Sequence, residues 1–174
     1  MLKRAVPAAL LFTALDQGTK WLAVRWHEKC LLEGRETVLD IIPHFFNFVF
    51  ATNDGASFGF LSGQRWPLSV FALVALALLT VFRKKIFPPC QPLPAVTFAL
   101  LAGGIAGNLI DRVRIAEVVD FIHFYWRAWS FPVFNIADMC ITFGLGLYIA
   151  GQVVAERNAR RAAREAAAES TGAE

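Results

Sequence analysis

The sequence is poor in charge, in cysteine and in histidine. Only 18% of its 174 residues are charged and 56% are hydrophobic, and the mean hydropathy is +0.49. Such a chain is too apolar to cover the surface of a soluble domain of this size. The three cysteines share no close spacing, so neither a disulfide framework nor a structural zinc site is predicted. These shortages indicate a membrane protein.

Other absences narrow the class further. No glycine-rich phosphate loop appears, and the three histidines lack the spacing of metal ligands. The 16 Phe and 5 Trp exclude a disordered chain. A net charge of +3 and a pI near 9.0 would suit a nucleic-acid binder, but the basic residues lie mostly beside apolar runs, where they act as topology signals. We therefore expect one compact membrane domain with no nucleic-acid partner.

Four apolar segments approach the roughly 20 residues with which a helix crosses about 30 Å of hydrocarbon. They are expected at 5–26, 66–82, 93–110 and 131–154, and the last two each begin near a proline that suits a first helical turn. The first segment also resembles a signal peptide. No small-residue cleavage site follows Leu15, however, so we expect a retained span.

The distribution of charge predicts the orientation of these spans. Lysine and arginine cluster at 3–4, 83–85 and 157–164, which all lie on the cytoplasmic side if the chain crosses four times. Both termini are then cytoplasmic, and the acidic, aromatic-rich loops 27–65 and 111–130 lie outside. The expected fold is an all-α membrane domain of four transmembrane helices over residues 1–155, followed by a charged cytoplasmic tail at 156–174.

The first outer loop carries a β pattern. Phe46, Phe48 and Phe50 alternate with other residues, which predicts a short strand lying on the membrane surface. The Asn53-Asp54-Gly55 sequence that follows is typical of a turn. From the residues alone we therefore expect a short strand followed by a turn.

Charged residues within spans need a partner, a water-lined cavity or a role. Asp16 and Lys20 are four residues apart on one predicted helix, the spacing of an intrahelical ion pair. A structural pair that holds helices in place is one interpretation, and direct contact with a substrate is the other.

The third span ends in a segment rich in small and polar residues. Gly103 and Gly107 are four apart and permit close helix packing. Asn108 and Arg112 share a face, on which they could present an amide and a cation to a carbonyl or a phosphate headgroup. Anchoring the helix at the bilayer edge is the alternative. Asp111, next to Arg112, also needs a partner.

The strongest candidate pair is Asp120, within Val118–Phe121, and Asp138, near the start of the fourth span. Two carboxylates in one low-dielectric cleft share a proton, so that one acts as base towards water and the other as acid towards a peptide carbonyl. Asn135, three residues before Asp138, could orient that carboxylate. In the alternative interpretation the two acids are unrelated, and each pairs with an arginine such as Arg112 or Arg114.

Taken together, the motifs resemble the lipoprotein signal peptidase (signal peptidase II) family of bacterial inner-membrane aspartyl proteases. Five blocks occur in the family's order: Asp16–Lys20 resembles DxxTK, Asn53–Phe58 resembles NxGxxF, Gly103–Arg112 resembles GGxxGNxxDR, and Val118–Phe121 and Phe134–Asp138 resemble the two blocks that hold the catalytic aspartates. One block would be weak evidence, whereas five in order are specific.

The resemblance implies that Asp120 and Asp138 are the catalytic dyad, close to the periplasmic face, and that residues 28–62 form a small extracytoplasmic β-rich cradle. It implies supporting or substrate-binding roles for a further set: Asp16, Lys20, Asn53, Gly55, Asn108, Asp111, Arg112, Asn135 and Ala137. The implied substrate is a diacylglyceryl-prolipoprotein cut just before its lipidated cysteine, and inhibition by globomycin is implied as well. The enzyme would work as a monomer in contact with membrane lipid, without metal or organic cofactor.

Two other functions compete with this hypothesis. A small proton-coupled transporter or channel would rest on Asp16, Lys20 and Asp111 alone. A non-catalytic scaffold for lipoprotein assembly would leave both aspartates replaceable. Flux through liposomes without peptide hydrolysis would favour the transporter.

Overall fold

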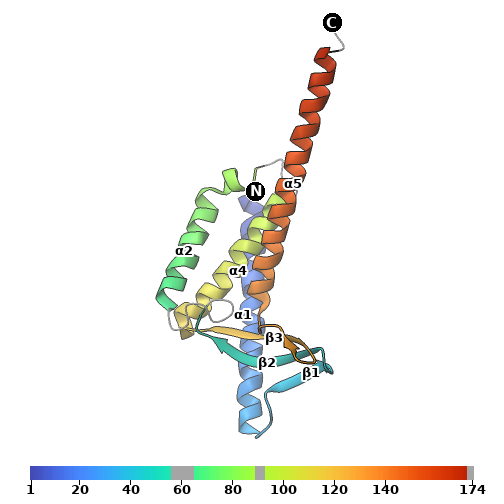
Figure 1. Cartoon of the computed structure of the whole chain (residues 1–174). Coiled ribbons are helices and arrows are strands. Elements are labelled where there is room, and N and C mark those ends of the chain that lie inside the picture. Colours follow the sequence, from blue (N-terminus) through green and yellow to red (C-terminus); the bar gives the residue numbers. More distant parts are fainter. Residues whose placement is uncertain (56–64, 89–92, 172–174) are drawn as a thin grey trace.

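The computed structural model describes residues 1–55, 65–88 and 93–171, which form long helices with a small sheet across one end (Figure 1). The helices are α1 (Leu2–Leu32), α2 (Arg65–Val81), the short α3 (Arg83–Ile86), α4 (Pro94–Ile115) and α5 (Ile136–Thr171). The strands are β1 (Val38–Ile42), β2 (Phe46–Asn53), β3 (Val118–Trp126) and β4 (Trp129–Ser130). The fold is therefore mostly helical with a small antiparallel sheet.

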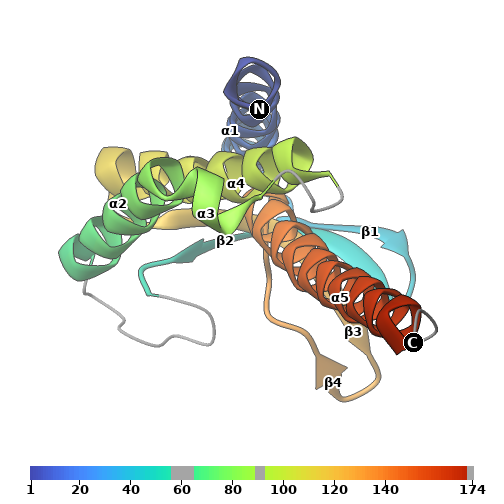
Figure 2. The same cartoon turned by 90° about the horizontal axis from the view of Figure 1, so that it is seen from above.

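Helix α4 is the centre of the bundle. It packs against α1, α5 and α2, and seen from above it lies between α1 and α5 (Figure 2). Glycines allow this close approach: a Cβ on Gly103 would lie 2.9 Å from the Ala9 carbonyl oxygen, and one on Gly104 would lie 2.5 Å from that of Ala137. The small residues of α4 thus serve the packing role that their spacing predicts.

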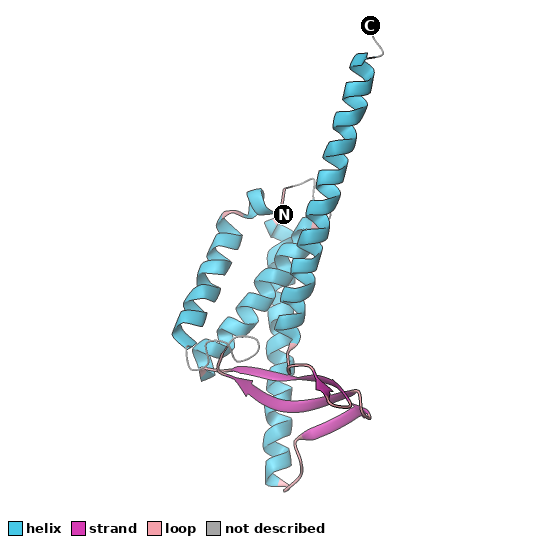
Figure 3. Cartoon of the chain, in the orientation of Figure 1, coloured by secondary structure: helices cyan, strands magenta, loops and turns pink. Residues whose placement is uncertain are grey.

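The sheet joins two loops that are distant in the sequence. Its strand order is β1-β2-β3-β4, and β2 from the first loop pairs antiparallel with β3 from the second (Figure 3). The strand predicted around Phe46–Phe50 is confirmed as part of β2. The strands β3 and β4 were not predicted, because the first five residues of β3 are all buried and show no polar alternation.

Helix ends differ from the predicted segments. Helix α1 continues past 26 to Leu32, and α4 continues past 110 to Ile115. Pro94 does occupy the first turn of α4. The prediction that a proline begins the fourth helix is wrong, because α5 starts at Ile136 and Pro132 lies in the preceding loop. The helix start is set instead by a hydrogen-bonded cap at Asn135, described below.

Among the described residues, two helical stretches are long and apolar enough to cross a membrane, Pro94–Ile115 and Ile136–Glu165. The apolar stretch of α2, Trp66–Val81, is shorter. Four crossings therefore stay a prediction. The start of α1 and the far part of α5 lie at the end of the bundle away from the sheet (Figure 1). We call this the tail end, and the opposite end the sheet end.

Candidate active site

The structure brings Asp120 and Asp138 to the same cavity at the sheet end. Asp120 lies on β3 and is 4% exposed, whereas Asp138 lies in the first turn of α5. Both line a cavity of about 820 Å³ whose other walls come from β2, α2, α4 and the loop before α5. Three further residues from the predicted set contribute polar groups to the cavity wall: Asn53, Asn108 and Arg112. The remaining lining is almost entirely apolar, so the two carboxylates sit in a largely apolar cleft.

Asp138 is held by a reciprocal cap at the start of α5. The side-chain Oδ1 of Asn135 accepts a hydrogen bond from the backbone N–H of Asp138 at 3.0 Å. In return, Asp138 Oδ2 accepts one from the backbone N–H of Asn135 at 3.3 Å. This is the geometry of a capping box, in which the third helical residue reaches back to the capping residue. The positive end of the helix dipole therefore lies next to the Asp138 carboxylate.

Asn135 contacts both aspartates. Its side-chain amide Nδ2 donates to Asp120 Oδ1 at 2.6 Å and also lies 3.3 Å from the Val119 carbonyl oxygen. The side chain has 0% exposure. The prediction that Asn135 orients Asp138 agrees with this geometry, and the structure adds that the same side chain fixes Asp120.

The surroundings of Asp120 favour its protonated form. Desolvation by burial, followed by the nearby charge of Asp138, raises the pKa of the Asp120 carboxyl from 3.8 to about 7. Hydrogen bonds from Asn135 and Asn53 and the charge of Lys20 oppose this rise. A carboxyl that titrates near neutrality can exchange a proton at physiological pH, which a general acid must do.

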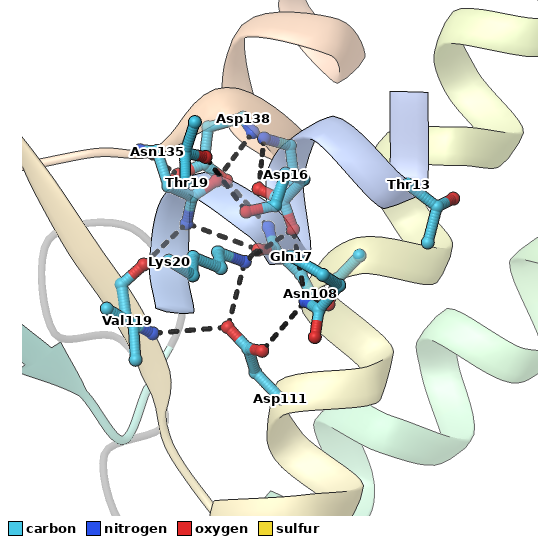
Figure 4. Close-up of polar contacts among 12 residues, drawn as sticks. Thr13, Asp16, Gln17, Thr19, Lys20, Asn108, Asp111, Val119, Asn135 and Asp138 are labelled. Carbon is cyan, nitrogen blue, oxygen red and sulfur yellow. Dashed lines mark hydrogen bonds and ion pairs between the residues drawn. The ribbon is translucent and has the colours of Figure 1, made fainter. Parts of the chain in front are cut away.

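Asn108 connects Asp138 to a buried ion-pair cluster. Its Nδ2 donates to Asp138 Oδ1 at 2.7 Å, and its Oδ1 accepts from Lys20 Nζ at 2.9 Å. Lys20 Nζ also lies 2.9 Å from Asp16 Oδ2 and 2.8 Å from Asp111 Oδ2 (Figure 4). The ion pair predicted between Asp16 and Lys20 is confirmed, and Asp111 is its third member.

The cluster is tied to the segments that carry the two aspartates. Asp16 Oδ1 accepts a hydrogen bond from the Ala137 amide at 2.8 Å, next to Asp138. Asp111 Oδ2 lies 3.3 Å from the Val119 amide, next to Asp120. Figure 4 shows these groups converging from α1, α4, α5 and β3. Asp16 of α1 thus reaches the backbone beside Asp138, and Asp111 of α4 reaches the backbone beside Asp120.

Gln17 belongs to the same cluster and was not predicted. Its Nε2 lies 2.9 Å from Asp111 Oδ1, 3.1 Å from the Gly107 carbonyl oxygen and 3.2 Å from Asp16 Oδ2. The only sequence signal is its place between Asp16 and Lys20. Residues of α2 that line the cavity, such as Leu68 and Phe71, were also missed, since apolar residues in a span carry no distinguishing pattern.

Arg112 joins the cavity to the turn after β2. Its Nη2 donates to the Gly55 carbonyl oxygen at 3.0 Å, and the Gly55 amide donates to Asn53 Oδ1 at 2.9 Å. Among the described residues, no arginine forms an ion pair within 4.0 Å of Asp120 or Asp138. The interpretation of two separately paired acids is thus not supported. Ala56, Ser57 and Phe58 of the predicted loop motif lie outside the described residues.

The chemistry available at this site is acid–base chemistry. In the part of the chain that the structure describes, no group of three or more His, Cys, Asp or Glu side chains is placed to hold a metal ion. What the cavity offers is two electrostatically interacting carboxyl groups in its lining, one with a pKa of about 7, together with amides and a guanidinium. Such a set can activate a water molecule and protonate a carbonyl oxygen.

Comparison with solved structures supports a membrane enzyme. One structure, described as a bacterial membrane enzyme, matches with a TM-score of 0.73 and 30% identity over 91% of this chain and 92% of its own. A second, described in the same terms, matches with a TM-score of 0.66 and 30% identity over 86% of this chain and 92% of its own.

Sequence comparison identifies the family. The chain is 38% identical to a lipoprotein signal peptidase of Symbiobacterium thermophilum over 88% of this chain and 96% of that protein. It is 39% identical to one of Syntrophotalea carbinolica over 83% of this chain and 87% of that protein. The profile of the family described as signal peptidase (SPase) II matches residues 8–154. The chain belongs to the signal peptidase II family.

Proposed function

We propose that this protein is an intramembrane aspartyl endopeptidase that removes the signal peptide from diacylglyceryl-modified prolipoproteins, cutting just before the lipidated cysteine. Membership of the signal peptidase II family and relatives named lipoprotein signal peptidases support the reaction. The observation that carries the aspartyl mechanism is the placement of Asp120 and Asp138 on the wall of one cavity.

In this mechanism a water molecule lies between the two carboxyl groups. One carboxylate accepts a proton from the water as it attacks the scissile carbonyl, while the other donates a proton to the carbonyl oxygen. When the tetrahedral intermediate collapses, the carboxyl that took the proton from water gives it to the leaving amine. The other carboxylate takes its proton back from a hydroxyl of the intermediate as the carbonyl forms again, so the dyad returns to its starting state. The apolar lining limits solvation of the charges, so that the proton stays shared between the two acids.

The other polar groups of the cavity bind the substrate backbone. Arg112 and Asn53 lie on the wall nearest the turn after β2, where a guanidinium and an amide can hold peptide carbonyls beside the scissile bond. A further set of residues supports the groups that line the cavity: Asp16, Lys20, Gly55, Asp111, Asn135 and Ala137.

The cavity also suits a substrate that arrives through the bilayer. Its apolar walls come from α2 and α5 as well as from α4, and they include Phe71, Ala75 and Phe143. Lipid on the substrate adds affinity, at roughly 0.8 kcal/mol per buried methylene. A signal helix with a diacylated cysteine can therefore diffuse laterally to the site and remain in an apolar environment.

The proposed topology has four membrane crossings by α1, α2, α4 and α5, with both termini in the cytoplasm and the sheet at the outer face of the bacterial inner membrane. The basic residues at 3–4, 83–85 and 157–164 support this orientation. The start of α1 and the far part of α5 lie at the same end of the bundle, which an even number of crossings requires (Figure 1). We propose a monomer as the working unit.

The transporter alternative is not favoured. It rested on Asp16, Lys20 and Asp111, and these three residues are engaged with one another in buried ion pairs of 2.8–2.9 Å. Groups held in this way support a structure better than they carry a proton or ion. The family's named members are peptidases rather than transporters.

The decisive experiment compares a diacylated precursor with its unlipidated form. The purified protein is incubated with each precursor in the same detergent, and the products are identified by mass spectrometry. We expect one cut, directly before the lipidated cysteine, and little or no cleavage of the unlipidated form. Equal cleavage of both forms, or a cut elsewhere, would contradict the substrate assignment.

A further inference from the structure

We propose that Asp16 and Lys20 are positioning residues that hold Asp138 as the ionised, proton-accepting member of the dyad, with the shared proton on Asp120. This inference rests on the proposed function and adds to it a role for each aspartate. It is carried by the hydrogen bonds that converge on Asp138 and by the way the ion-pair cluster fixes their direction.

Both oxygens of Asp138 accept hydrogen bonds from groups that can only donate in this arrangement. Oδ2 accepts a hydrogen bond from the backbone N–H of Asn135 at 3.3 Å, and Oδ1 accepts one from the side-chain Nδ2 of Asn108 at 2.7 Å. An ionised carboxylate is an acceptor at every position, whereas a protonated one must place a hydrogen somewhere. Hydrogen bonds to the charged form favour that form.

The direction of the Asn108 amide is set by Lys20. Lys20 Nζ donates to Asn108 Oδ1 at 2.9 Å, and an ammonium group has no acceptor. The carbonyl side of Asn108 must therefore face Lys20, which leaves the NH₂ side for Asp138. Asn135 Nδ2, 3.2 Å from Asn108 Oδ1, strengthens the same orientation.

Asp16 acts on Asp138 through the backbone. Its Oδ1 accepts from the Ala137 amide at 2.8 Å, so a carboxylate of α1 satisfies one of the free amides in the first turn of α5. Its Oδ2 holds Lys20 Nζ at 2.9 Å. Only a carboxylate can accept on both sides at once, since an amide would turn its NH₂ group towards one of two donors.

Asp120 lies in a different environment, although Asn135 Nδ2 donates to its Oδ1 at 2.6 Å. It lies on a buried strand rather than at a helix N-terminus, and burial raises its pKa to about 7. The charged groups that surround Asp138 among the described residues are Asp120 from β3, Asp111 and Arg112 from α4, and Asp16 and Lys20 from α1. Arg112 interacts electrostatically with Asp138 more than with Asp120. Lys20 acts on Asp138 through the orientation of Asn108.

The test uses the variants Lys20→Met and Asp16→Asn, with Glu28→Gln as the matched control. Glu28 forms an exposed ion pair with Arg25 on the same helix, away from the cluster. We measure kcat and KM for a diacylated precursor from acidic to alkaline pH, and thermal unfolding shows that each variant is folded. Asp16→Asn keeps the volume of the side chain and so serves if Lys20→Met does not fold.

The two variants should lower kcat by about 10–100-fold, as loss of a supporting contact does at other sites, with KM nearly unchanged. The acidic limb of the pH profile should move to higher pH, because the donors held towards the Asp138 oxygens are no longer fixed in direction, and the alkaline limb should stay. Glu28→Gln should leave both limbs unchanged. Folded variants with lower thermal stability but an unshifted acidic limb would overturn the inference, since a merely structural role predicts that result.

A second measurement places the proton directly. Infrared spectroscopy of protein with isotope-labelled aspartate, at about pH 5, should show a protonated-carboxyl band that Asp120→Asn removes and Asp138→Asn retains. A band that survives Asp120→Asn and disappears in Asp138→Asn would reverse the assignment. Normal cleavage by either dyad variant would instead contradict the proposed function itself, so the two failures are distinguishable.

Discussion

The two ends of the bundle share helices α1 and α4 but are held together in opposite ways. At the tail end, α1, α4 and the segment after α3 pack through Ala5, Phe87, Phe98 and Ala102. The rings of Phe87 and Phe98 meet edge to face, with their centroids 5.9 Å apart. At the sheet end, α1, α4 and α5 meet through Asp16, Lys20, Asn108, Asp111 and Asn135, all buried and all hydrogen bonded.

The difference shows where stability and function lie. Apolar packing is sufficient to hold helices together, as the tail end demonstrates. Buried charges and amides are more expensive to place in an apolar environment and are retained where they have a task. At the sheet end that task is to fix two carboxyl groups whose own burial is unfavourable.

Removing either dyad carboxylate should have the largest effect. Asp120→Asn and Asp138→Asn should each reduce cleavage of a diacylated precursor by about 10²–10⁴-fold or more, because one proton-transfer step is lost. Single-turnover cleavage assays measure this. Asp120→Asn should remain folded, since it resembles the protonated side chain. Near-normal cleavage by either folded variant would remove the contrast between the two ends.

Gly107→Ala should disturb the sheet end from behind. A Cβ at this position would lie 2.4 Å from Asp16 Oδ2 and 3.0 Å from its Cγ, and Asp16 is fully buried. We expect a loss of stability of about 1–3 kcal/mol and at least a tenfold loss of kcat.

Gly18→Ala is the matched control for that substitution. Gly18 lies on α1 beside Asp16 and Lys20, but a Cβ there would meet nothing within 4 Å. Alanine should be neutral or stabilise the helix by about 0.5–1 kcal/mol. Equal loss of kcat in both variants would show that small residues, rather than the position of Asp16, decide the effect.

The pH dependence should single out Asp120. Because its pKa is raised to about 7, cleavage that needs its proton should fall as the pH rises above about 7. The folded state binds this proton more tightly than the unfolded chain, whose pKa is near 3.8, so stability should decline between about pH 4 and pH 7, by the order of a few kcal/mol. Thermal unfolding across this range checks the sign. The slope should flatten in Asp120→Asn.

Phe98→Ala should affect the tail end alone. The ring is 3% exposed and packs against Phe87, so its removal leaves a cavity and should lower stability by about 3–5 kcal/mol. We expect kcat and the pH profile of the folded protein to be unchanged. A shifted pH profile would mean that the two ends are coupled, contrary to the comparison.

Removing residues 157–174 should have the smallest effect. The ion pairs of this part of α5, Arg160–Glu156 and Arg161–Glu165, are 62–82% exposed and contact only the helix itself. Exposed pairs of this kind contribute about 0.3–0.5 kcal/mol each. Cleavage and thermal unfolding of the truncated protein should match those of the full chain.

Much of the site was predictable because its residues are out of place in apolar segments. Asp16, Lys20, Asp111 and Asp138 stand out for this reason, and the spacing of Asp16 and Lys20 predicted their ion pair. Gln17 and the residues of α2 in the cavity wall did not stand out, because an amide in a polar cluster and a leucine in a span have no periodic signal. The strand β3 escaped prediction because burial removes the alternation by which strands are recognised.

The sequence by itself determined that this is a membrane protein with apolar helices, which family it belongs to and which residue types form the site. It could do so because composition and local spacing are properties of the chain alone. Only the tertiary structure decided which groups meet. Hydrogen bonds across 121 residues, between Asp16 and the Ala137 amide, and across 15, between Asn135 and Asp120, depend on how helices and strands pack. Burial in that packing, rather than any local pattern, gives Asp120 a pKa near 7.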